Sequence, residues 1–255
     1  MYKILAINPG ATSTKIAVYE DENEIFSKTI YHSNEEISRF KKVSDQYEFR
    51  KKTIIDALKE VSFSLDTLSA VVGRGGLLKP LDGGTYLVNE KMVEDLRERP
   101  RAEHASNLGA LIAKDIASSL GIQAFIVDPV CVDEFEPIAR ISGLPEIERE
   151  SLSHALNLKA MAKRYAKEIG KRYEELNLIV VHLGSGISVS AHKKGRMIDV
   201  NDASAEGPFA PERSGSVPER ALVKLCYSGK YTAKEMEKKI FGEGGMYAYL
   251  GTRDA

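Results

Sequence analysis

Apolar and polar residues alternate along three short stretches at the start of the chain. Residues 3–8, 14–20 and 24–31 each follow the two-residue period of a strand that is buried on one face. A glycine-containing turn separates the first two stretches, and the turn EDEN at residues 20–23 separates the second from the third. The pattern predicts three consecutive antiparallel strands, an N-terminal meander.

The apolar spacing then changes to that of helices and short buried strands. We predict helices over 45–61, 89–97 and 104–120, and strands over 68–72 and 124–128. The second of these strands ends before Pro129, which stops regular strand pairing.

The second half of the chain has a similar order of elements. A helix is predicted over 151–173, and its apolar stripe is formed by Leu152, Leu156, Met161 and Tyr165. A second meander follows at 178–183, 186–193 and 196–200, then a Gly/Pro/Ser loop over 202–218 and helices over 219–227 and 232–240.

Strand, turn, strand, strand and then helices therefore occur twice, which predicts a duplicated α/β domain around a central cleft. We place the domains at 1–148 and 149–255. No further strands follow the second meander, so the second domain is expected to be incomplete and to need a C-terminal segment.

Both meanders contain a turn rich in Gly and Ser/Thr. The segments are NPGATSTKIAVY from Asn8 and HLGSGISVSAHKKGRMIDV from His182. Each places backbone N–H groups and hydroxyls between two strands, where they can face an anion. Neither contains GxxxxGK[ST] or GxGxxG, which disfavours P-loop and Rossmann sites. Turns also favour Gly, Ser and Asn for conformational reasons alone, so the composition of each turn has an ordinary structural explanation as well.

Composition narrows the class of protein. The 43% apolar content is enough to form cores, and the net charge of -1 disfavours nucleic acid or an anionic membrane as main partner. Cys131 and Cys226 lack the spacing of a disulfide framework or a zinc site. The chain has neither a signal-peptide pattern nor a run of about 18 apolar residues, so we expect a cytoplasmic protein.

Six segments in order resemble the acetate kinase/butyrate kinase family, within the larger group of actin, sugar kinases and the Hsp70 ATPase domain. They are NPGATSTKIAVY, VVGRGGLLKPLDGG, HASNLGA, VDPVCVDEF, VHLGSGISVSA and NDASAEGPFAPERSG. GATSTK and HLGSG are closer to the butyrate kinase members than to the acetate kinase members. The resemblance implies duplicated ribonuclease H-like (actin-like ATPase) domains, with mixed sheets flanked by helices. Residues 1–148 are then expected to bind acyl substrate and phosphate, and residues 149–255 the nucleotide. We expect this chain to bind ATP less well than a version with the family's C-terminal part.

The resemblance also implies a reversible phosphotransfer from ATP to the carboxylate of a short-chain fatty acid, butyrate or a branched analogue, with Mg²⁺. A carboxylic acid is already ionised at neutral pH, so the reaction needs no general base. Catalysis is then expected to depend on bringing two anions together and stabilising the charge on the transferred group.

The family positions point to four catalytic residues. Arg74 and Arg213 lie in glycine-rich loops, where a permanently charged guanidinium can hold carboxylate or phosphoryl oxygens. We expect Arg74 to bind the substrate carboxylate and Arg213 the moving phosphoryl group. His182 is expected to donate to a phosphoryl oxygen, and Asp128 to orient an arginine or a metal-bound water. His104 also matches a family position, although it can equally cap or pack a helix.

Phosphate-binding residues are expected in both turns. In the first turn these are Asn8, Gly10, Thr12, Thr14 and Lys15, and in the second Gly184, Ser185 and Gly186. The metal contacts, made through water, are assigned to Asn8 and Asp202. Val72, Leu77, Leu78 and Pro80 are candidates for the acyl pocket, and equally for ordinary core.

Three other functions stay open from the sequence. One is an acetate or propionate kinase, and another is a hydroxyl kinase of the sugar-kinase type, in which Asp128 would be a general base. The third is a non-enzymatic ATP switch like actin or Hsp70. ATP/ADP is expected as the nucleotide in each case. We also expect a homo-oligomer.

Overall fold

The computed structural model describes residues 1–252, which belong to two compact units, Met1–Cys131 and Val132–Ala255. Residues 132–148, which the sequence assigns to the first domain, group with the second unit. The reason is that this segment is bonded to later residues: the Glu134 carboxylate accepts hydrogen bonds from Lys159 and from the N–H of Met197.

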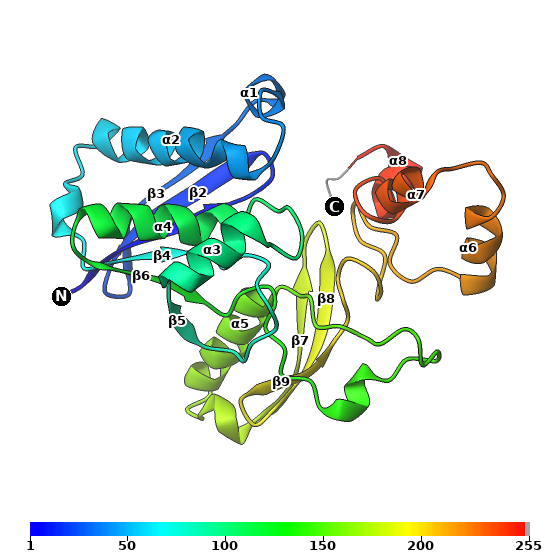
Figure 1. Cartoon of the computed structure of the whole chain (residues 1–255). Helices are drawn as coiled ribbons and strands as arrows, with labels where there is room; N and C mark the ends of the chain where they lie inside the picture. Colours follow the sequence, from blue (N-terminus) through cyan, green and yellow to red (C-terminus); the bar gives the residue numbers. More distant parts are fainter. Residues whose placement is uncertain (253–255) are drawn as a thin grey trace. The chain divides into compact units, whose positions relative to one another are not determined.

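The first unit contains one mixed sheet with the strand order β3-β2-β1-β4-β6-β5 (Figure 1). The strands are β1 (Lys3–Pro9), β2 (Ser13–Glu20), β3 (Asn23–Tyr31), β4 (Ala70–Gly73), β5 (Thr85–Leu87) and β6 (Gln123–Val127). β1, β2 and β3 pair antiparallel, which confirms the predicted N-terminal meander. β1, β4 and β6 pair parallel, so their carboxyl ends meet at one edge of the sheet.

Two helices cover one face of this sheet (Figure 1). The helices of the unit are α1 (Asn34–Ser38), α2 (Tyr47–Glu60), α3 (Glu90–Glu98) and α4 (Asn107–Ser119), with short 3-10 helices at Ser44–Gln46 and Leu65–Thr67. α4 packs on β1, β4 and β6, and α2 packs on β2 and β3. Alternate residues of the strands, among them Leu5, Ile7, Ile16 and Val18, are buried beneath them. The alternation seen in the sequence is therefore the buried face of the sheet.

One strand and one α-helix of this unit, β5 and α1, are not predicted from the apolar pattern. β5 has only three residues and follows the glycine-rich segment after Arg74, where the pattern carries no strand period. α1 has no buried residue, and a capping box between Ser33 and Glu36 stabilises its first turn instead. Because α1 is stabilised by local hydrogen bonds and not by burial of an apolar face, the spacing of apolar residues does not predict it.

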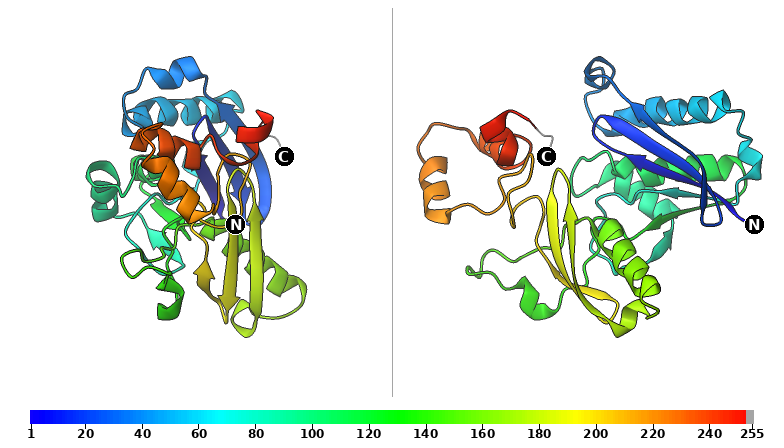
Figure 2. Two further views of the ribbon diagram at one scale, coloured as in Figure 1. Left: turned by 90° about the vertical axis from the view of Figure 1, so that its right-hand side faces the viewer. Right: turned by 180° about the vertical axis from the view of Figure 1, so that it is seen from behind.

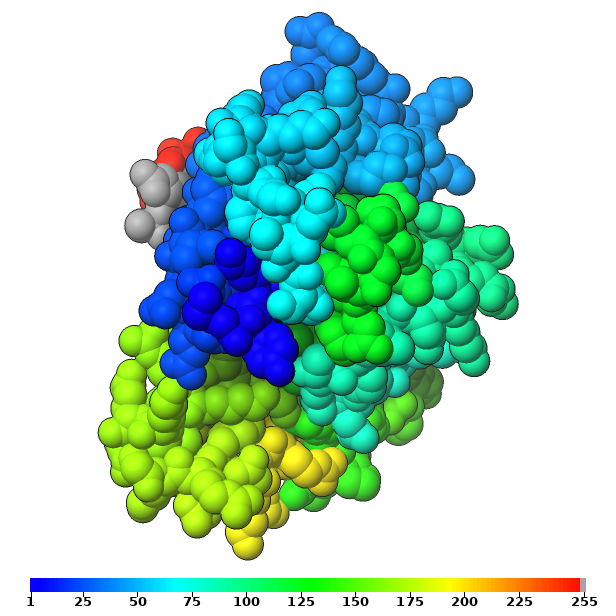
Figure 3. Space-filling model, turned by 90° about the vertical axis from the view of Figure 1, so that its left-hand side faces the viewer, coloured from blue at the N-terminus to red at the C-terminus, as the bar shows by residue number. Residues whose placement is uncertain are grey.

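The N-terminal residues lie beside the segment that leads into β4. Figure 3 shows them in dark blue against the cyan segment, and Lys3 and Ser69 exchange two hydrogen bonds there. This contact places β4 next to β1 in the parallel register that pairs Ile4 with Ala70.

The second unit contains an antiparallel sheet with the order β7-β8-β9, and α5 packs on β7 (Figure 2). The elements are β7 (Asn177–Leu183), β8 (Ile187–Lys193), β9 (Arg196–Val200), α5 (Ala155–Glu168), α6 (Glu219–Cys226), α7 (Ala233–Ile240) and α8 (Gly245–Leu250), with 3-10 helices at Pro137–Arg140 and Tyr173–Glu175. This confirms the second meander, while α8 is not predicted from the sequence. Within residues 1–252, no helix has both the length and the apolarity that crossing a membrane requires.

The apolar stripe predicted for the helix at 151–173 is wrong. Leu156, Met161 and Tyr165 are 44–48% exposed, and Leu152 precedes the helix. The buried face of α5 consists of Ala155, Leu158, Lys159, Ala162 and Ala166. Small side chains are buried here because they let the helix backbone approach β7, and its large apolar side chains lie on the other faces.

A buried polar network lies under α5. The Lys159 ammonium binds both carboxylate oxygens of Glu134, at 2.8 and 2.7 Å. Beside this pair, His192 contacts the Tyr173 hydroxyl through Nδ1 and the Ser190 hydroxyl through Nε2. Each ring nitrogen therefore has a partner, which offsets the cost of burying the polar group.

The free energy of unfolding should fall as the pH drops from about 6.5 towards 4. Burial, reinforced by the charge of Lys159, lowers the pKa of His192 from 6.5 to about 4. The unfolded chain therefore binds a proton more readily in this window, so stability present above pH 6.5 is lost as the pH falls. Urea unfolding at several pH values tests this, with His192→Gln as comparison. The variant should show a shallower pH dependence, and identical slopes would contradict the assignment.

Candidate functional site

Three of the predicted site residues lie at the carboxyl ends of neighbouring parallel strands of the first unit. Ile7 pairs with Gly73, and Gly73 pairs with Ile126, so the parallel pairing of β1, β4 and β6 ends at one level. Asn8 is next after Ile7, Arg74 is next after Gly73, and Asp128 comes two residues after Ile126. In open α/β sheets ligands bind outside this edge of the strands. The structure thus brings Asn8, Arg74 and Asp128 to one edge.

Arg74 is held at this edge by both its backbone and its side chain. Its N–H donates to the carbonyl of Ile7 at 2.8 Å, and its Nη1 donates to Oδ1 of Asn8 at 3.3 Å. Burial lowers the pKa of the guanidinium from its ordinary value. A half-buried cation that contacts a neutral amide can still bind an anion strongly.

The backbone before Arg74 packs directly against α4. A Cβ atom added at Gly73 would lie 2.2 Å from the carbonyl oxygen of Gly109, and one added at Gly109 would lie 2.5 Å from the carbonyl oxygen of Arg74. Glycine at both positions therefore allows the helix to contact the end of β4. This contact determines where Arg74 leaves the sheet.

Asp128 is buried and holds a second loop. Its carboxylate accepts from the N–H of Gly84 at 2.7 Å, and its own N–H donates to the Gly84 carbonyl at 2.9 Å. Its φ of 38° lies in the left-handed region, which Asp tolerates better than most residues. One carboxylate oxygen thus anchors the DGG segment, which suits an orienting role better than that of a mobile base.

The first turn is organised from inside by a residue that sequence reasoning missed. Arg50 of α2 donates to the carbonyls of Gly10, Ala11 and Ser13 and to the hydroxyl of Thr14. The Thr14 hydroxyl also bonds to Nε2 of His32 at 2.9 Å, and Thr14 is fully buried.

The expected phosphate-binding residues of the first turn therefore lie on different sides of it. Thr14 faces the interior, where Arg50 and His32 use its hydroxyl, whereas Thr12 and Lys15 are exposed. Lys15 pairs directly across the strands with Asn8. The exposed side of the turn thus presents an amide and a cation.

The second unit brings three predicted groups together. The turn Gly184–Gly186 connects β7 to β8, and a Cβ atom added at Gly186 would lie 2.0 Å from Nη1 of Arg213. A Cβ atom added at Gly184 would lie 2.8 Å from Nε2 of His182. Arg213 and His182 both lie against this turn, and its glycines leave room for them.

Arg213 lies in the loop after β9 and is positioned by contacts with that loop and with the residue that follows α7. Its Nη1 donates to the Ala203 carbonyl at 2.7 Å, and its guanidinium lies over the ring of Phe241 at 4.4 Å. Its Nε is buried and has no hydrogen-bond partner within the described residues. Burial lowers the pKa of Arg213, while the charges of Glu212 and Asp202 act in the opposite direction. A buried donor next to a phosphate-type turn is ready to bind an oxyanion.

His182 stacks on a second histidine that sequence reasoning missed. The rings of His154 and His182 are 3.9 Å apart between centroids and 11° from parallel. Nδ1 of His182 lies 3.0 Å from Oδ1 of Asn157, and Nδ1 of His154 lies 2.9 Å from the buried Ser188 hydroxyl. The stack fixes the ring of His182 so that Nε2 points to the turn. His154 stands one residue before α5, and only a local SHALN sequence marks it.

Asp202 and Asn8 were assigned to Mg²⁺ through water. Oδ1 of Asp202 accepts from the N–H and the hydroxyl of Ser204, at 2.7 and 2.6 Å. Over residues 1–252, no group of three or more His, Cys, Asp or Glu side chains is arranged to hold a metal ion. Mg²⁺ bound to a nucleotide needs only one or two protein oxygens besides phosphate and water, so this oriented carboxylate fits the ion.

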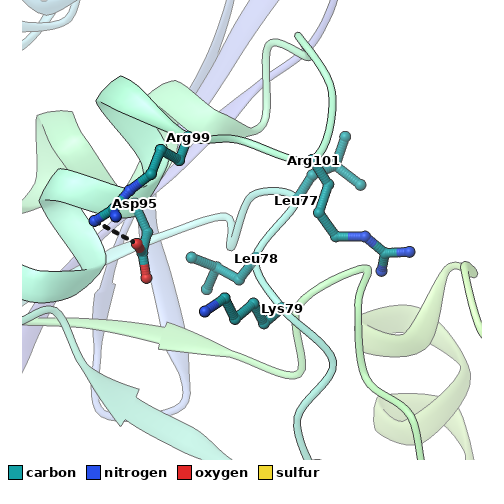
Figure 4. Close-up of a pocket in the computed structure, with 6 residues that line it drawn as sticks. All are labelled: Leu77, Leu78, Lys79, Asp95, Arg99 and Arg101. Carbon is teal, nitrogen blue, oxygen red and sulfur yellow. Dashed lines mark ion pairs between the residues drawn. The ribbon is translucent and has the colours of Figure 1, made fainter.

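A small pocket lies on the segment that follows Arg74 (Figure 4). It has a volume of about 140 Å³ and is lined by Leu77, Leu78, Lys79, Asp95, Arg99 and Arg101. Arg99 lies 3.5 Å from Asp95. Of the four acyl-pocket candidates, Leu77 and Leu78 line this pocket, whereas Val72 and Pro80 do not. The lining combines apolar side chains with three cations.

His104 serves the start of α4. Its Nδ1 accepts from the N–H of Ser106 at 3.1 Å and lies 2.7 Å from the Ser106 hydroxyl. The His104 side chain thus holds the N-cap residue of α4, Ser106, and whether it has a further role stays a prediction.

Comparison with known proteins identifies the chain's relatives. The model of the acetokinase family matches residues 149–254. Butyrate kinase 1 of Clostridium acetobutylicum is 58% identical over all 255 residues, which cover 72% of that protein. A probable butyrate kinase of Clostridium botulinum is 57% identical over 254 residues, or 99% of this chain and 72% of that protein.

Solved structures agree in fold. The crystal structure of Porphyromonas gingivalis acetate kinase matches with a TM-score of 0.75 at 19% identity, covering 100% of this chain and 71% of that one. A propionate kinase from Francisella tularensis matches with a TM-score of 0.73 at 18% identity and the same coverage. These confirm the acetate kinase-like, actin-like ATPase fold predicted from the sequence. On the identity to its relatives over the full chain, the protein belongs to the butyrate kinase family.

Proposed function

We propose that the protein transfers the γ-phosphoryl group of ATP to the carboxylate of a short-chain fatty acid, butyrate or a branched analogue, and catalyses the reverse reaction. The observation that carries this proposal is the 58% identity to Butyrate kinase 1 over all 255 residues. The arrangement of Arg213 and His182 against the second turn supports it, because two nitrogen donors beside a phosphate-type turn suit a charged phosphoryl group.

In the proposed reaction a carboxylate oxygen attacks the γ-phosphorus as the bond to the β-γ bridging oxygen breaks, and ADP leaves. Arg74 binds the carboxylate, and Arg213 stabilises the phosphoryl oxygens. When Nδ1 of His182 donates to Asn157, Nε2 donates to phosphate only in the imidazolium form. Asp128 orients the loop behind Arg74 through Gly84.

The two turns would hold the phosphate chain through their backbone N–H groups. Thr12 of the first turn and Gly184, Ser185 and Gly186 of the second would contribute, with Lys15 as a nearby cation. The N–H of Gly10, which the sequence also assigns to phosphate, instead donates to the carbonyl of Ser13 at 2.7 Å, so its part is to close the turn. Mg²⁺ would be held through water by Asp202 and Asn8, and it would supply charge neutralisation of the phosphates. Cytoplasmic location and homo-oligomer formation stay predictions from the sequence.

Hydroxylamine should trap an acyl hydroxamate when the natural protein is incubated with ATP, Mg²⁺ and butyrate. The reason is that an acyl phosphate reacts with this nucleophile, whereas a sugar phosphate does not. Parallel assays with acetate, propionate and isobutyrate rank the acyl chains, and each methylene should change kcat/KM by about 10- to 200-fold at most. ADP formation that needs no carboxylate and gives no hydroxamate would refute the proposal in favour of a hydroxyl kinase or an ATP switch.

A further inference from the structure

Arg50 is a buried cation whose five hydrogen-bond acceptors are all neutral. Its side chain is 0% exposed. Nε donates to the Gln46 amide oxygen at 2.9 Å, and the other four bonds, of 2.8–3.1 Å, go to the turn at residues 10–14. Burial lowers the pKa of Arg50 to about 10, so the group is charged at neutral pH.

A contrast within the protein shows how unusual this is. Lys159 is also buried, but it binds both oxygens of Glu134 and so has a carboxylate to balance its charge. Burying a charge without such a partner is costly, and an apolar side chain of similar size would avoid that cost. Packing alone therefore does not account for a guanidinium at this position.

The hydrogen bonds of Arg50 determine which way the peptide groups of the turn point. Arg50 donates hydrogen bonds to the carbonyls of Gly10 and Ala11, and the N–H of His32 donates to the carbonyl of Thr12. In a trans peptide the N–H points opposite to the preceding carbonyl, so the N–H groups of Ala11 and Thr12 point outward. Both residues are exposed, and neither N–H has a protein acceptor in the part of the chain that the structure describes.

We propose that Arg50 is a positioning residue for the nucleotide phosphates. It turns the carbonyls of residues 10–13 inward, leaves a pair of N–H donors facing outward, and places a positive charge behind them. The bound anion balances this charge from the other side of the turn. The inference rests on the proposed function in that the anion is taken to be the phosphate chain of ATP.

The test measures dissociation constants of ATP, ADP and AMP by calorimetry for the natural protein and its Arg50→Gln and Arg50→Lys variants. Because a charge near a polyphosphate acts in proportion to the phosphate charge, Arg50→Gln should weaken ATP binding about 30-fold and AMP binding less than about 3-fold. The dissociation constant of ATP for Arg50→Lys should lie between those of the natural protein and Arg50→Gln, since lysine keeps the charge but lacks the planar set of guanidinium donors. The matched control is Arg39→Gln, an exposed arginine of the same unit, which should bind like the wild type.

Kinetics give a second measurement. The KM for ATP should rise in Arg50→Gln while the KM for butyrate stays unchanged. Equal weakening of ATP and AMP, or ATP binding unchanged from wild type, would overturn the proposal. Should Arg50→Gln fail to fold, the same comparison in Arg50→Lys decides. The two proposals can fail separately. If the natural protein makes no acyl phosphate but its Arg50 variants still lose ATP affinity, the role of Arg50 is supported and only the proposed reaction is refuted.

Discussion

Replacing Arg213 with glutamine should lower kcat for acyl phosphate formation by about 10³-fold, the usual effect of removing a donor or arginine from a phosphoryl-transfer transition state. The guanidinium lies against Gly186 of the second turn, and its buried Nε has no acceptor within residues 1–252. Phe241 and Ala203 already orient it, so binding the phosphoryl group requires little further ordering.

Initial rates under saturating ATP and butyrate check this result, with unfolding curves to show that the variant is folded. Arg164→Gln is the control, because Arg164 is an exposed arginine paired with Glu168 on α5. Arg213→Lys should recover part of the rate, since it keeps the charge without the planar fork. A folded Arg213→Gln enzyme within threefold of wild type would exclude Arg213 from the reaction.

Gly73→Ala should destabilise the protein by about 3 kcal/mol, the upper range for overpacking. The added methyl group would lie 2.2 Å from the carbonyl oxygen of Gly109 and 2.8 Å from the N atom of Ala110. All these neighbours are backbone atoms of α4, so no side-chain rotation relieves the overlap. The helix would have to move away from β4, and Arg74 would move with the strand end.

Urea unfolding of Gly73→Ala and of Gly143→Ala separates this effect from that of any glycine replacement. A Cβ atom at Gly143 meets nothing within 4 Å, so that variant should unfold like the wild type. Equal stability of the two variants would show that α4 and β4 tolerate a wider separation.

The strands and most helices could be predicted because burial of one face leaves a periodic mark. Leu5, Ile7, Ile16 and Val18 alternate along β1 and β2 and are at most 2% exposed. The same reasoning predicted the wrong buried face for α5, since that face is made mainly of alanines and a lysine. Apolar patterning gives most weight to large side chains, whereas close contact between a helix and a sheet selects small ones.

The candidate site divides in a similar way. Arg74 and Arg213 were identified because they lie in glycine-rich loops at positions that match a family. Arg50 stands in the charged stretch FRKK, which reads as a solvent-exposed helix face, and its burial depends on a turn 36–40 residues earlier in the chain. Lys159 was missed for the same reason, because its partner Glu134 lies 25 residues away.

The way the first turn is held also bears on how its sequence can drift during evolution. The outward donors at Ala11 and Thr12 belong to the main chain, and Arg50 maintains their direction from within. Mutations that exchange the two exposed side chains for other small ones leave recognition intact. We therefore expect selection at this hairpin to act mainly on the interior position Arg50, so that homologues can differ in the exposed loop residues and still bind the same nucleotide.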